Sequence, residues 1–207
     1  MTILTRRFTD AVDYARIAHA PQFRKGSGIP YIYHLLGVAS LVLQYGGSED
    51  QAIAGLLHDV LEDCGAGHEG SIRAQFGDHV ADIVVACTDG TVEGKAAAQA
   101  AGSPYDHWRE RKLAYLEHLR QVPETVLLVS GCDKLHNARA ILGDLENPEV
   151  GVAVFDRFTA KRDGTLGYYQ ALAEILTARN APMARAFDDT VARIHQLARA
   201  DERRALS

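Results

Sequence analysis

Eight residues of the chain, LLHDVLED (56–63), combine one imidazole with three carboxylates in an otherwise apolar segment. Ionised carboxylates so close together repel one another, and burying them without a compensating charge is costly. His58 and Asp59 offer the nitrogen and oxygen ligands that bind divalent cations such as Mn²⁺, Fe²⁺, Zn²⁺ or Mg²⁺. A bound cation would also remove the repulsion between the acids. The stretch therefore points to a metal site.

Two ligands rarely suffice to hold a metal ion, so the others must come from elsewhere in the chain. The best candidates are His34, in an apolar stretch, and Asp133, in the apolar run around Leu128 and Leu135. A charged aspartate in such a run needs a partner. The residues alone leave one alternative open, in which the acids of LLHDVLED face solvent and His34 is a hydrogen-bonded histidine of the core.

The metal-ligand candidates require helices to position them, and the apolar spacing predicts an all-α fold. The expected helices cover residues 8–18, 30–45, 48–63, 71–76, 78–87, 104–120, 124–142, 165–178 and 182–200. The run ETVLLVS (124–130) could also form a strand, but its apolar spacing continues at helical intervals to Leu142, which favours a helix. Residues 88–103 form a long loop of small residues, expected to be a mobile lid or a disordered segment.

Helix-start signals precede three of these segments. Thr5 or Thr9 is expected to cap the first helix, and Pro30 suits the first turn of the second. Ser48-Glu49-Asp50-Gln51 is a capping-box pattern, which opens the helix that carries LLHDVLED.

On one continuous helix, residues three and four positions apart share a face. We therefore expect His58 beside Glu62, and Asp59 beside both Glu62 and Asp63.

The composition, 47% hydrophobic and 24% charged over 207 residues, is that of an ordinary globular protein. We expect a single domain over residues 1–207, with its core at about 8–180 and a C-terminal helical extension at about 181–207. A net charge of −5 argues against a general nucleic-acid-binding surface. Three cysteines without CxxC spacing favour a reducing compartment. Since no apolar run approaches the roughly 18 residues of a membrane span, we expect a soluble, cytoplasmic protein.

Three segments resemble, in order, motifs of the hydrolase domain of RelA/SpoT-type alarmone enzymes. They are RKGSGIPYIYH (24–34), LLHDVLED (56–63) and DKLHNAR (133–139). His34, then His58-Asp59, then Asp133 also match the H…HD…D signature of HD-domain phosphohydrolases. The similarity covers roughly residues 8–180, and the small single-domain alarmone hydrolases match best because the chain leaves no room for a synthetase domain.

The resemblance implies an HD-domain phosphohydrolase-like helical fold and a metal-dependent pyrophosphohydrolase. Such an enzyme removes the 3′-pyrophosphate of (p)ppGpp-like alarmones and gives GDP or GTP and pyrophosphate. It would hold one divalent metal, typically Mn²⁺, through four ligands: His34, His58, Asp59 and Asp133. Glu62 and Asp63 match the acidic pair that positions or deprotonates the attacking water.

The resemblance also implies contacts with the substrate. Arg24 and Lys25 match a basic dipeptide that packs against the purine base, although without the resemblance they would indicate a solvated loop. Asn137, one helical turn after Asp133, would contact the sugar or a phosphate. Tyr31, by its position in IPYIYH, is expected to pack rather than to catalyse.

Three other functions share these features. A hydrolase that prefers adenine alarmones, (p)ppApp, stays open because nothing in RKGSG distinguishes the two bases. An HD nucleotidase or phosphodiesterase would share the metal site but does not explain RKGSGIPY together with HDVLED. A non-catalytic nucleotide sensor is disfavoured because all four ligands and both acids are present. The expected partner is a small nucleotide, with neither nucleic acid nor a membrane, and the sequence carries no signal of an oligomeric state.

Overall fold

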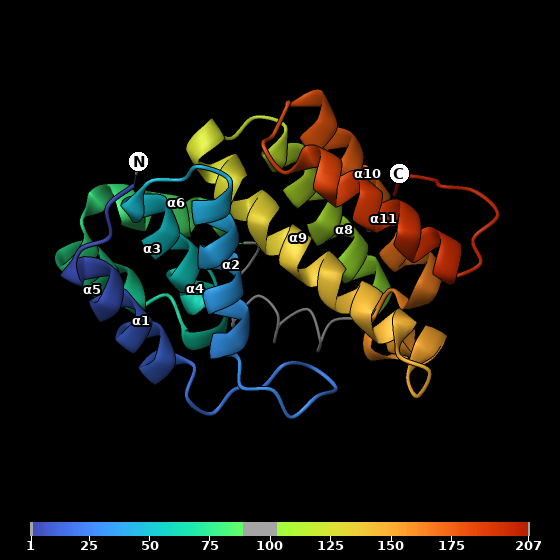
Figure 1. Ribbon diagram of the computed structural model, residues 1–207, viewed down its shortest axis with the longest axis horizontal. Coiled ribbons are helices and arrows are strands. Elements are labelled where there is room, and N and C mark those ends of the chain that lie inside the picture. The colour runs from blue at the N-terminus through green and yellow to red at the C-terminus, as the bar shows by residue number, and fades with distance from the viewer. Residues whose placement is uncertain (1, 89–102, 207) are drawn as a thin grey trace. The chain divides into compact units, whose positions relative to one another are not determined.

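The computed structural model describes residues 2–88 and 103–206 (Figure 1). Within these ranges the chain is all-α, as the apolar spacing predicts, and its β-structure is limited to one isolated bridge between Phe23 and Pro30. The chain divides into two compact units, residues 1–97 with 122–133 and residues 98–121 with 134–207. The expectation of a single domain over residues 1–207 stays a prediction.

The first unit contains six helices and the beginning of a seventh. They are α1 (Arg6–Ala18), α2 (Ile32–Gln44), α3 (Glu49–Leu57), α4 (Val60–Cys64), α5 (His68–Phe76), α6 (Asp78–Cys87) and the first part of α9 (Glu124–Glu146). The second unit contains α8 (Pro104–Leu119), the remainder of α9, the 3₁₀ helix η1 (Gly151–Arg157), α10 (Lys161–Ala178) and α11 (Ala184–Leu197). The run ETVLLVS is therefore helical, as predicted.

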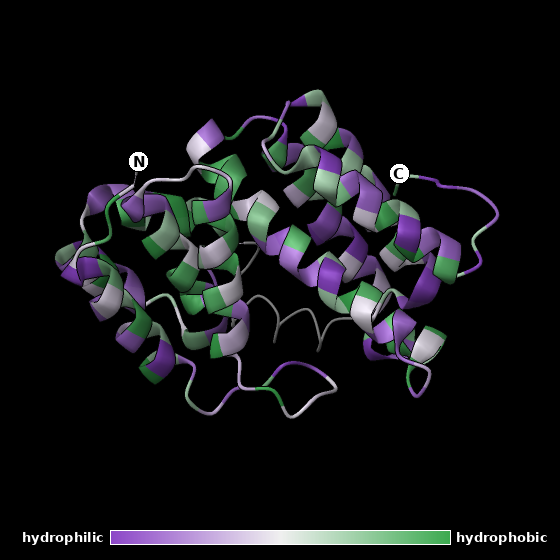
Figure 2. Cartoon of the chain, in the orientation of Figure 1, coloured by the Kyte–Doolittle hydropathy of each residue, from purple (hydrophilic) through white to green (hydrophobic). Residues whose placement is uncertain are grey.

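Helix α3 forms the centre of the first unit and packs against α1, α2 and α6. Every residue from Ala52 to Leu57 is buried, and Figure 2 shows hydrophobic residues concentrated on α2 and α3. Burying each large aliphatic side chain stabilises the fold by roughly 1.5–3 kcal/mol. Helices α2 and α3 approach closely at Gly55, where a Cβ would lie 3.4 Å from the Ala39 Cα. This packing fixes α2, which carries His34, and the end of α3, which is followed by His58 and Asp59.

Local hydrogen bonds define the helix starts. The capping box is present as predicted: Gln51 N donates to the Ser48 hydroxyl, and Ser48 N donates to the Gln51 amide oxygen. Thr5, rather than Thr9, caps α1 by accepting a hydrogen bond from Arg7 N. Helix α2 begins at Ile32, so the prediction of Pro30 as its first residue was two residues early.

The helix that carries LLHDVLED is interrupted, so the prediction of one continuous helix was wrong at this point. Helix α3 ends at Leu57 and α4 begins at Val60, with His58 and Asp59 in the turn between them. The His58 ring Nδ1 lies 2.9 Å from Gly55 O, the carbonyl that would accept the Asp59 N–H in a regular helix. Asp63 N still donates to Asp59 O, at 2.9 Å, so one helical turn joins the two acids.

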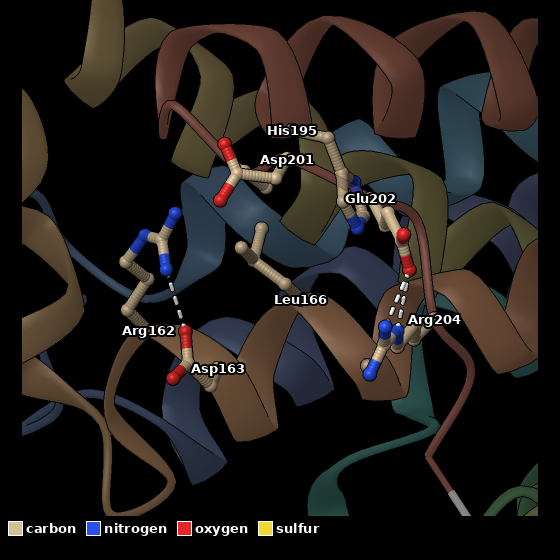
Figure 3. A pocket seen from close by; sticks show the side chains of 9 residues that line it. Arg162, Asp163, Leu166, His195, Asp201, Glu202 and Arg204 are labelled. Atoms are coloured by element: carbon tan, nitrogen blue, oxygen red, sulfur yellow. Dashed lines mark hydrogen bonds and ion pairs between the residues drawn. The ribbon is translucent and has the colours of Figure 1, made fainter.

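In the second unit, α10 packs against α11, and residues 200–206 run back along α10. Leu206 N donates to Gly167 O at 2.9 Å, and Arg162 donates to the carbonyls of Ala198 and Arg199 at the end of α11. A cavity of about 560 Å³ lies here, lined by both helices and the C-terminal segment (Figure 3). The predicted C-terminal extension therefore belongs to this unit.

Three further predictions concern a membrane span, the cysteines and the loop at 88–103. Among the described residues, no helix combines the length and apolarity needed to cross a membrane. All three cysteines carry free thiols. Apart from its two end residues, the predicted loop at 88–103 lies outside the described ranges.

Candidate metal centre

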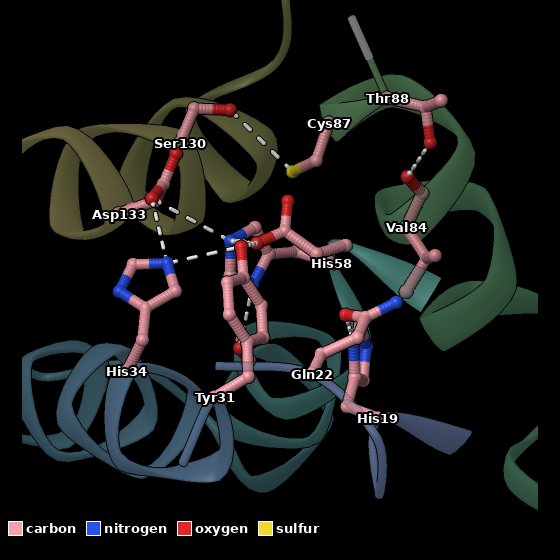
Figure 4. A network of polar contacts seen from close by, with 12 residues as sticks. His19, Gln22, Tyr31, His34, His58, Val84, Cys87, Thr88, Ser130 and Asp133 are labelled. Carbon is pink, nitrogen blue, oxygen red and sulfur yellow. Dashed lines mark hydrogen bonds and ion pairs between the residues drawn. The ribbon is translucent and has the colours of Figure 1, made fainter. Parts of the chain in front are cut away.

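The four predicted metal ligands converge in the first unit, and Figure 4 labels three of them, His34, His58 and Asp133. His34 lies in the first turn of α2, His58 and Asp59 in the turn after α3, and Asp133 on α9. One ligand atom from each of His34, His58 and Asp59 lies within 4.8 Å of the others. Asp133 Oδ1 is 3.2 Å from His34 Nε2 and 3.5 Å from His58 Nε2. The structure thus brings together side chains that are far apart in the sequence.

The His58 ring is oriented by the backbone. Its Nδ1 lies 2.9 Å from Gly55 O and donates to it, so Nε2 is the nitrogen that faces the two aspartates and can take either a proton or a metal ion. A backbone acceptor on one ring nitrogen is the usual way in which proteins fix a metal-binding imidazole. The hydrogen bond from His58 to Gly55 O, at the point where the helix is interrupted, therefore also orients the His58 ring toward the proposed metal site.

The donor atoms fit a divalent cation. His58 Nε2 is buried and makes no hydrogen bond of good geometry with any described residue, although Asp59 Oδ2 lies only 3.1 Å away. Asp59 Oδ2 is also 3.6 Å from His34 Nε2. Two imidazole nitrogens and two carboxylate oxygens gathered this closely form a ligand set for a borderline or hard metal ion.

The charges of the cluster also call for a cation. Burial acts to lower the pKa of His58, but the negative charges of Asp59 and Asp133 outweigh it and hold this pKa well above 6.5. Burial acts to raise the pKa of Asp59, but the positive charge of His58 and the close approach of both imidazoles hold it well below 3.8. Asp59 thus stays ionised and attracts positive charge, whether a proton or a metal ion.

A layer of polar contacts supports Asp59, and the sequence analysis missed it. The Tyr31 hydroxyl donates to Asp59 Oδ2 at 2.6 Å, and its ring stacks on the buried ring of His19. Gln22 links this layer to α4: its Oε1 lies 2.6 Å from His19 Nδ1, and its Nε2 donates to Asp63 O at 3.3 Å (Figure 4). Burial and the Asp59 charge raise the pKa of Tyr31 well above 10, which keeps the phenol a donor.

The predicted catalytic acids lie one turn beyond the ligands. Glu62 and Asp63 are both half-buried on α4, and Asp63 N bonds back to Asp59 O. The negative charge of Asp63 contributes to the raised pKa of Tyr31. Their catalytic roles and the predicted pairing of Glu62 with His58 stay predictions.

The residues predicted to contact the substrate lie in both units: Arg24 and Lys25 in the first, and Asn137 in the second. The Arg24 guanidinium lies 5.7 Å from the centre of the Tyr31 ring, beside the supporting layer, and Lys25 is exposed. Asn137 lies on α9 one turn after Asp133, in the second unit, so its contact with a nucleotide stays a prediction.

The fold is that of HD-domain proteins. The HD domain family matches residues 11–166, which is most of the chain, so the chain belongs to the HD domain family. A Listeria monocytogenes crystal structure is 26% identical with a TM-score of 0.61, covering 84% of this chain and 98% of that one. A solved metazoan orthologue of SpoT that hydrolyses ppGpp has a TM-score of 0.58, covers 87% of this chain and 99% of that one, and at 23% identity shows the fold alone.

Two named relatives are similar to the chain in sequence. The chain is 35% identical over 133 residues to the guanosine-3′,5′-bis(diphosphate) 3′-pyrophosphohydrolase MESH1 of Xenopus tropicalis, covering 63% of this chain and 66% of the relative. It is 35% identical over 154 residues to a probable enzyme of the same name from Synechocystis, covering 71% of this chain and 17% of that protein. The chain thus spans about two thirds of the first and a small part of the second. The resemblance to RelA/SpoT-type proteins is confirmed.

Proposed function

We propose that the chain is a metal-dependent pyrophosphohydrolase that removes the 3′-pyrophosphate of (p)ppGpp-like nucleotides. GDP or GTP and pyrophosphate would be the products. One observation carries the proposal, the convergence of four ligands in the order and spacing of the family motif: His34, His58, Asp59 and Asp133. Similarity to relatives named as pyrophosphohydrolases supports the choice of substrate.

Each part of the centre has a role in this reaction. A divalent ion, proposed to be Mn²⁺, supplies Lewis-acid chemistry at the phosphoryl group when it is bound by the four ligands. Glu62 and Asp63, half-buried one turn away, orient the attacking water and accept its proton. The hydrogen bond from Gln22 Nε2 to Asp63 O holds the backbone of this acidic pair in place.

The substrate would be held by positive charge and stacking. The Arg24 guanidinium, already seated near the Tyr31 ring, offers a planar cation on which a purine can stack, and Lys25 adds charge toward the phosphates. Asn137 is proposed to contact the sugar or a phosphate. A cytoplasmic location and the absence of nucleic-acid and membrane partners stay predictions.

A product assay tests the proposal. The purified chain is incubated with Mn²⁺ and ppGpp, and the nucleotides and pyrophosphate are resolved by ion-exchange chromatography. GDP and pyrophosphate in equal amounts are the expected products, and no pyrophosphate release with any divalent metal would overturn the proposal. A panel with ppApp, nucleoside monophosphates and cyclic nucleotides tests the other open substrates.

Replacing Glu62 by Gln provides a matched variant for this assay. Because the amide keeps the shape of the side chain but cannot take a proton, turnover should fall by about 10²–10⁴-fold. Calorimetric Mn²⁺ affinity should stay within a few fold, since Glu62 is not among the four ligands. Full turnover by this variant would remove Glu62 from the mechanism.

A further inference from the structure

We infer that Tyr31 is a positioning residue of the metal centre, because its hydroxyl holds Asp59 in the orientation that presents Oδ2 to the two imidazoles. The inference rests on the ligand set of the proposed function. It assigns a role to a side chain that the sequence analysis expected only to pack.

Asp59 Oδ2 contacts both Tyr31 and the two imidazoles. The Tyr31 hydroxyl lies 2.6 Å from Asp59 Oδ2. The same oxygen is 3.1 Å from His58 Nε2 and 3.6 Å from His34 Nε2. Rotation of the carboxylate would move this oxygen away from the imidazoles, and the phenol opposes that rotation. Carboxylates that bind metals are commonly held in this way by hydrogen bonds from a second layer of residues.

Tyr31 is itself held in place by ring contacts and backbone hydrogen bonds. The ring stacks on His19, with centroids 5.1 Å apart and planes 23° apart, and meets the His34 ring edge-on at 5.5 Å. Tyr31 N donates to Gln22 O at 3.0 Å, and Tyr31 O accepts from His34 N at 2.9 Å. Ring and backbone are therefore both fixed, so the hydroxyl is held at one point.

The hydroxyl and the ring of Tyr31 make separate contacts. Tyr31 touches two of the proposed ligands, Asp59 through the hydroxyl and His34 through the backbone and the ring edge. Packing against His19 and His34 needs only the ring, which phenylalanine also provides. Contact with Asp59 needs the hydroxyl. A Tyr31→Phe variant therefore removes the proposed function of Tyr31 and keeps its packing.

The test is metal binding without nucleotide. The metal-free chain and its Tyr31→Phe variant are titrated with Mn²⁺ by calorimetry, and the visible absorption spectra of their Co²⁺ forms are recorded. The variant should bind Mn²⁺ about 10–100-fold more weakly and show shifted Co²⁺ bands. The matched control is Tyr45→Phe, at the other end of α2, which should change neither measurement.

The outcomes are distinct. Wild-type Mn²⁺ affinity and an unchanged Co²⁺ spectrum in a folded Tyr31→Phe variant would overturn the inference and leave Tyr31 a packing residue. In an Asp59→Ala background, Tyr31→Phe should have no further effect, and an undiminished effect would also overturn it. If circular dichroism shows that Tyr31→Phe does not fold, His19→Ala replaces it, with a smaller loss of affinity expected and an unchanged affinity contradicting the inference.

This test does not depend on the reaction. Because no nucleotide is present, failure of the chain to hydrolyse ppGpp would leave the metal titration and its interpretation intact. Conversely, hydrolysis of ppGpp by a Tyr31→Phe variant with unchanged Mn²⁺ affinity would contradict the role of Tyr31 and support the proposed function.

Discussion

Two buried histidines, one in each unit, make the same backbone hydrogen bond but lie in opposite electrostatic surroundings. In the first unit, His58 Nδ1 lies 2.9 Å from Gly55 O, and in the second, His195 Nδ1 lies 2.9 Å from Val191 O. Among the described residues, neither Nε2 has a hydrogen-bond partner. Considered alone, each ring is presented as a metal ligand would be.

The neighbouring charges distinguish them. His58 faces Asp59 and Asp133, and these carboxylates raise its pKa despite burial. Burial lowers the pKa of His195 below 6.5, and the positive charges of Arg203 and Arg162 lower it further. His195 lines the cavity of the second unit, in which Figure 3 shows Arg162 and Arg204 paired with acids of their own.

The comparison shows that an oriented imidazole does not by itself make a cation site. A helical turn provides the backbone carbonyl in both units. The carboxylates come from a neighbouring residue and from a separate helix, and among the described residues only the first unit places two of them against the Nε2 atom of such a histidine. Three predictions test this contrast.

The largest effect is expected on catalysis. Replacing His58 by Gln removes a proposed ligand, so pyrophosphate release from ppGpp should fall by more than about 100-fold, beyond the usual cost of losing a supporting residue. Replacing His195 by Gln should leave it within twofold of the wild type. Both rates are measured at saturating Mn²⁺, and equal losses in the two variants would contradict the contrast.

A smaller effect is expected on stability. Mn²⁺ at 100 times its Kd should add about 2.7 kcal/mol to the free energy of unfolding, because the ion binds the folded state. For a chain of this size the melting temperature should rise by roughly 5–10 °C. Scanning calorimetry should show the same rise for His195→Gln and none for Asp133→Asn. A rise in the Asp133 variant would place the ion elsewhere.

The smallest effect is expected on the pH dependence of stability in the metal-free chain. Because the pKa of His195 is lowered in the folded state, its neutral form contributes stability above pH 6.5 that is lost as the pH falls toward the folded pKa. The raised pKa of His58 has the opposite sign: its contribution is present below 6.5 and is lost as the pH rises through the folded pKa.

Urea unfolding from pH 5 to 8 checks these signs. Replacing His195 by Gln should weaken the loss of stability toward pH 5, and replacing His58 by Gln should weaken the loss toward pH 8. His79, which is exposed, provides the control substitution. If the free energies of unfolding of the two variants changed with pH in parallel, the electrostatic surroundings of His58 and His195 would not differ as described.

Residues that act through local spacing were predictable from the sequence. The capping box at Ser48 and the helical character of ETVLLVS follow from neighbouring residue types, and both were predicted. The four ligands were found because charged groups in apolar runs need partners. Tyr31 was missed because its acceptor, Asp59, is 28 residues away, and tyrosine in an apolar motif usually packs.

Helix ends that depend on tertiary packing were predicted less well. Helix α10 begins at Lys161 rather than near 165, and it contains Gly164 in a turn with low helix propensity. A Cβ at Gly164 would lie 2.8 Å from the Ala160 Cβ and 3.3 Å from the Tyr105 ring. Glycine therefore relieves a close contact with Ala160 at the start of α10 and a tight one with Tyr105 of α8, and the contact with α8 depends on tertiary packing.

The turn between α3 and α4 has a consequence for protein engineering. On a regular helix, adjacent side chains point about 100° apart, so neighbouring residues do not share a target. At the turn, Asp59 has φ −93° and ψ −4°, and His58 Nε2 and Asp59 Oδ2 approach to 3.1 Å. A redesign that idealised residues 56–63 into one helix would improve local propensity and separate these two donor atoms. Here an imperfect helix is a requirement of the site, and substitutions that repair it should be screened out of any stabilised variant.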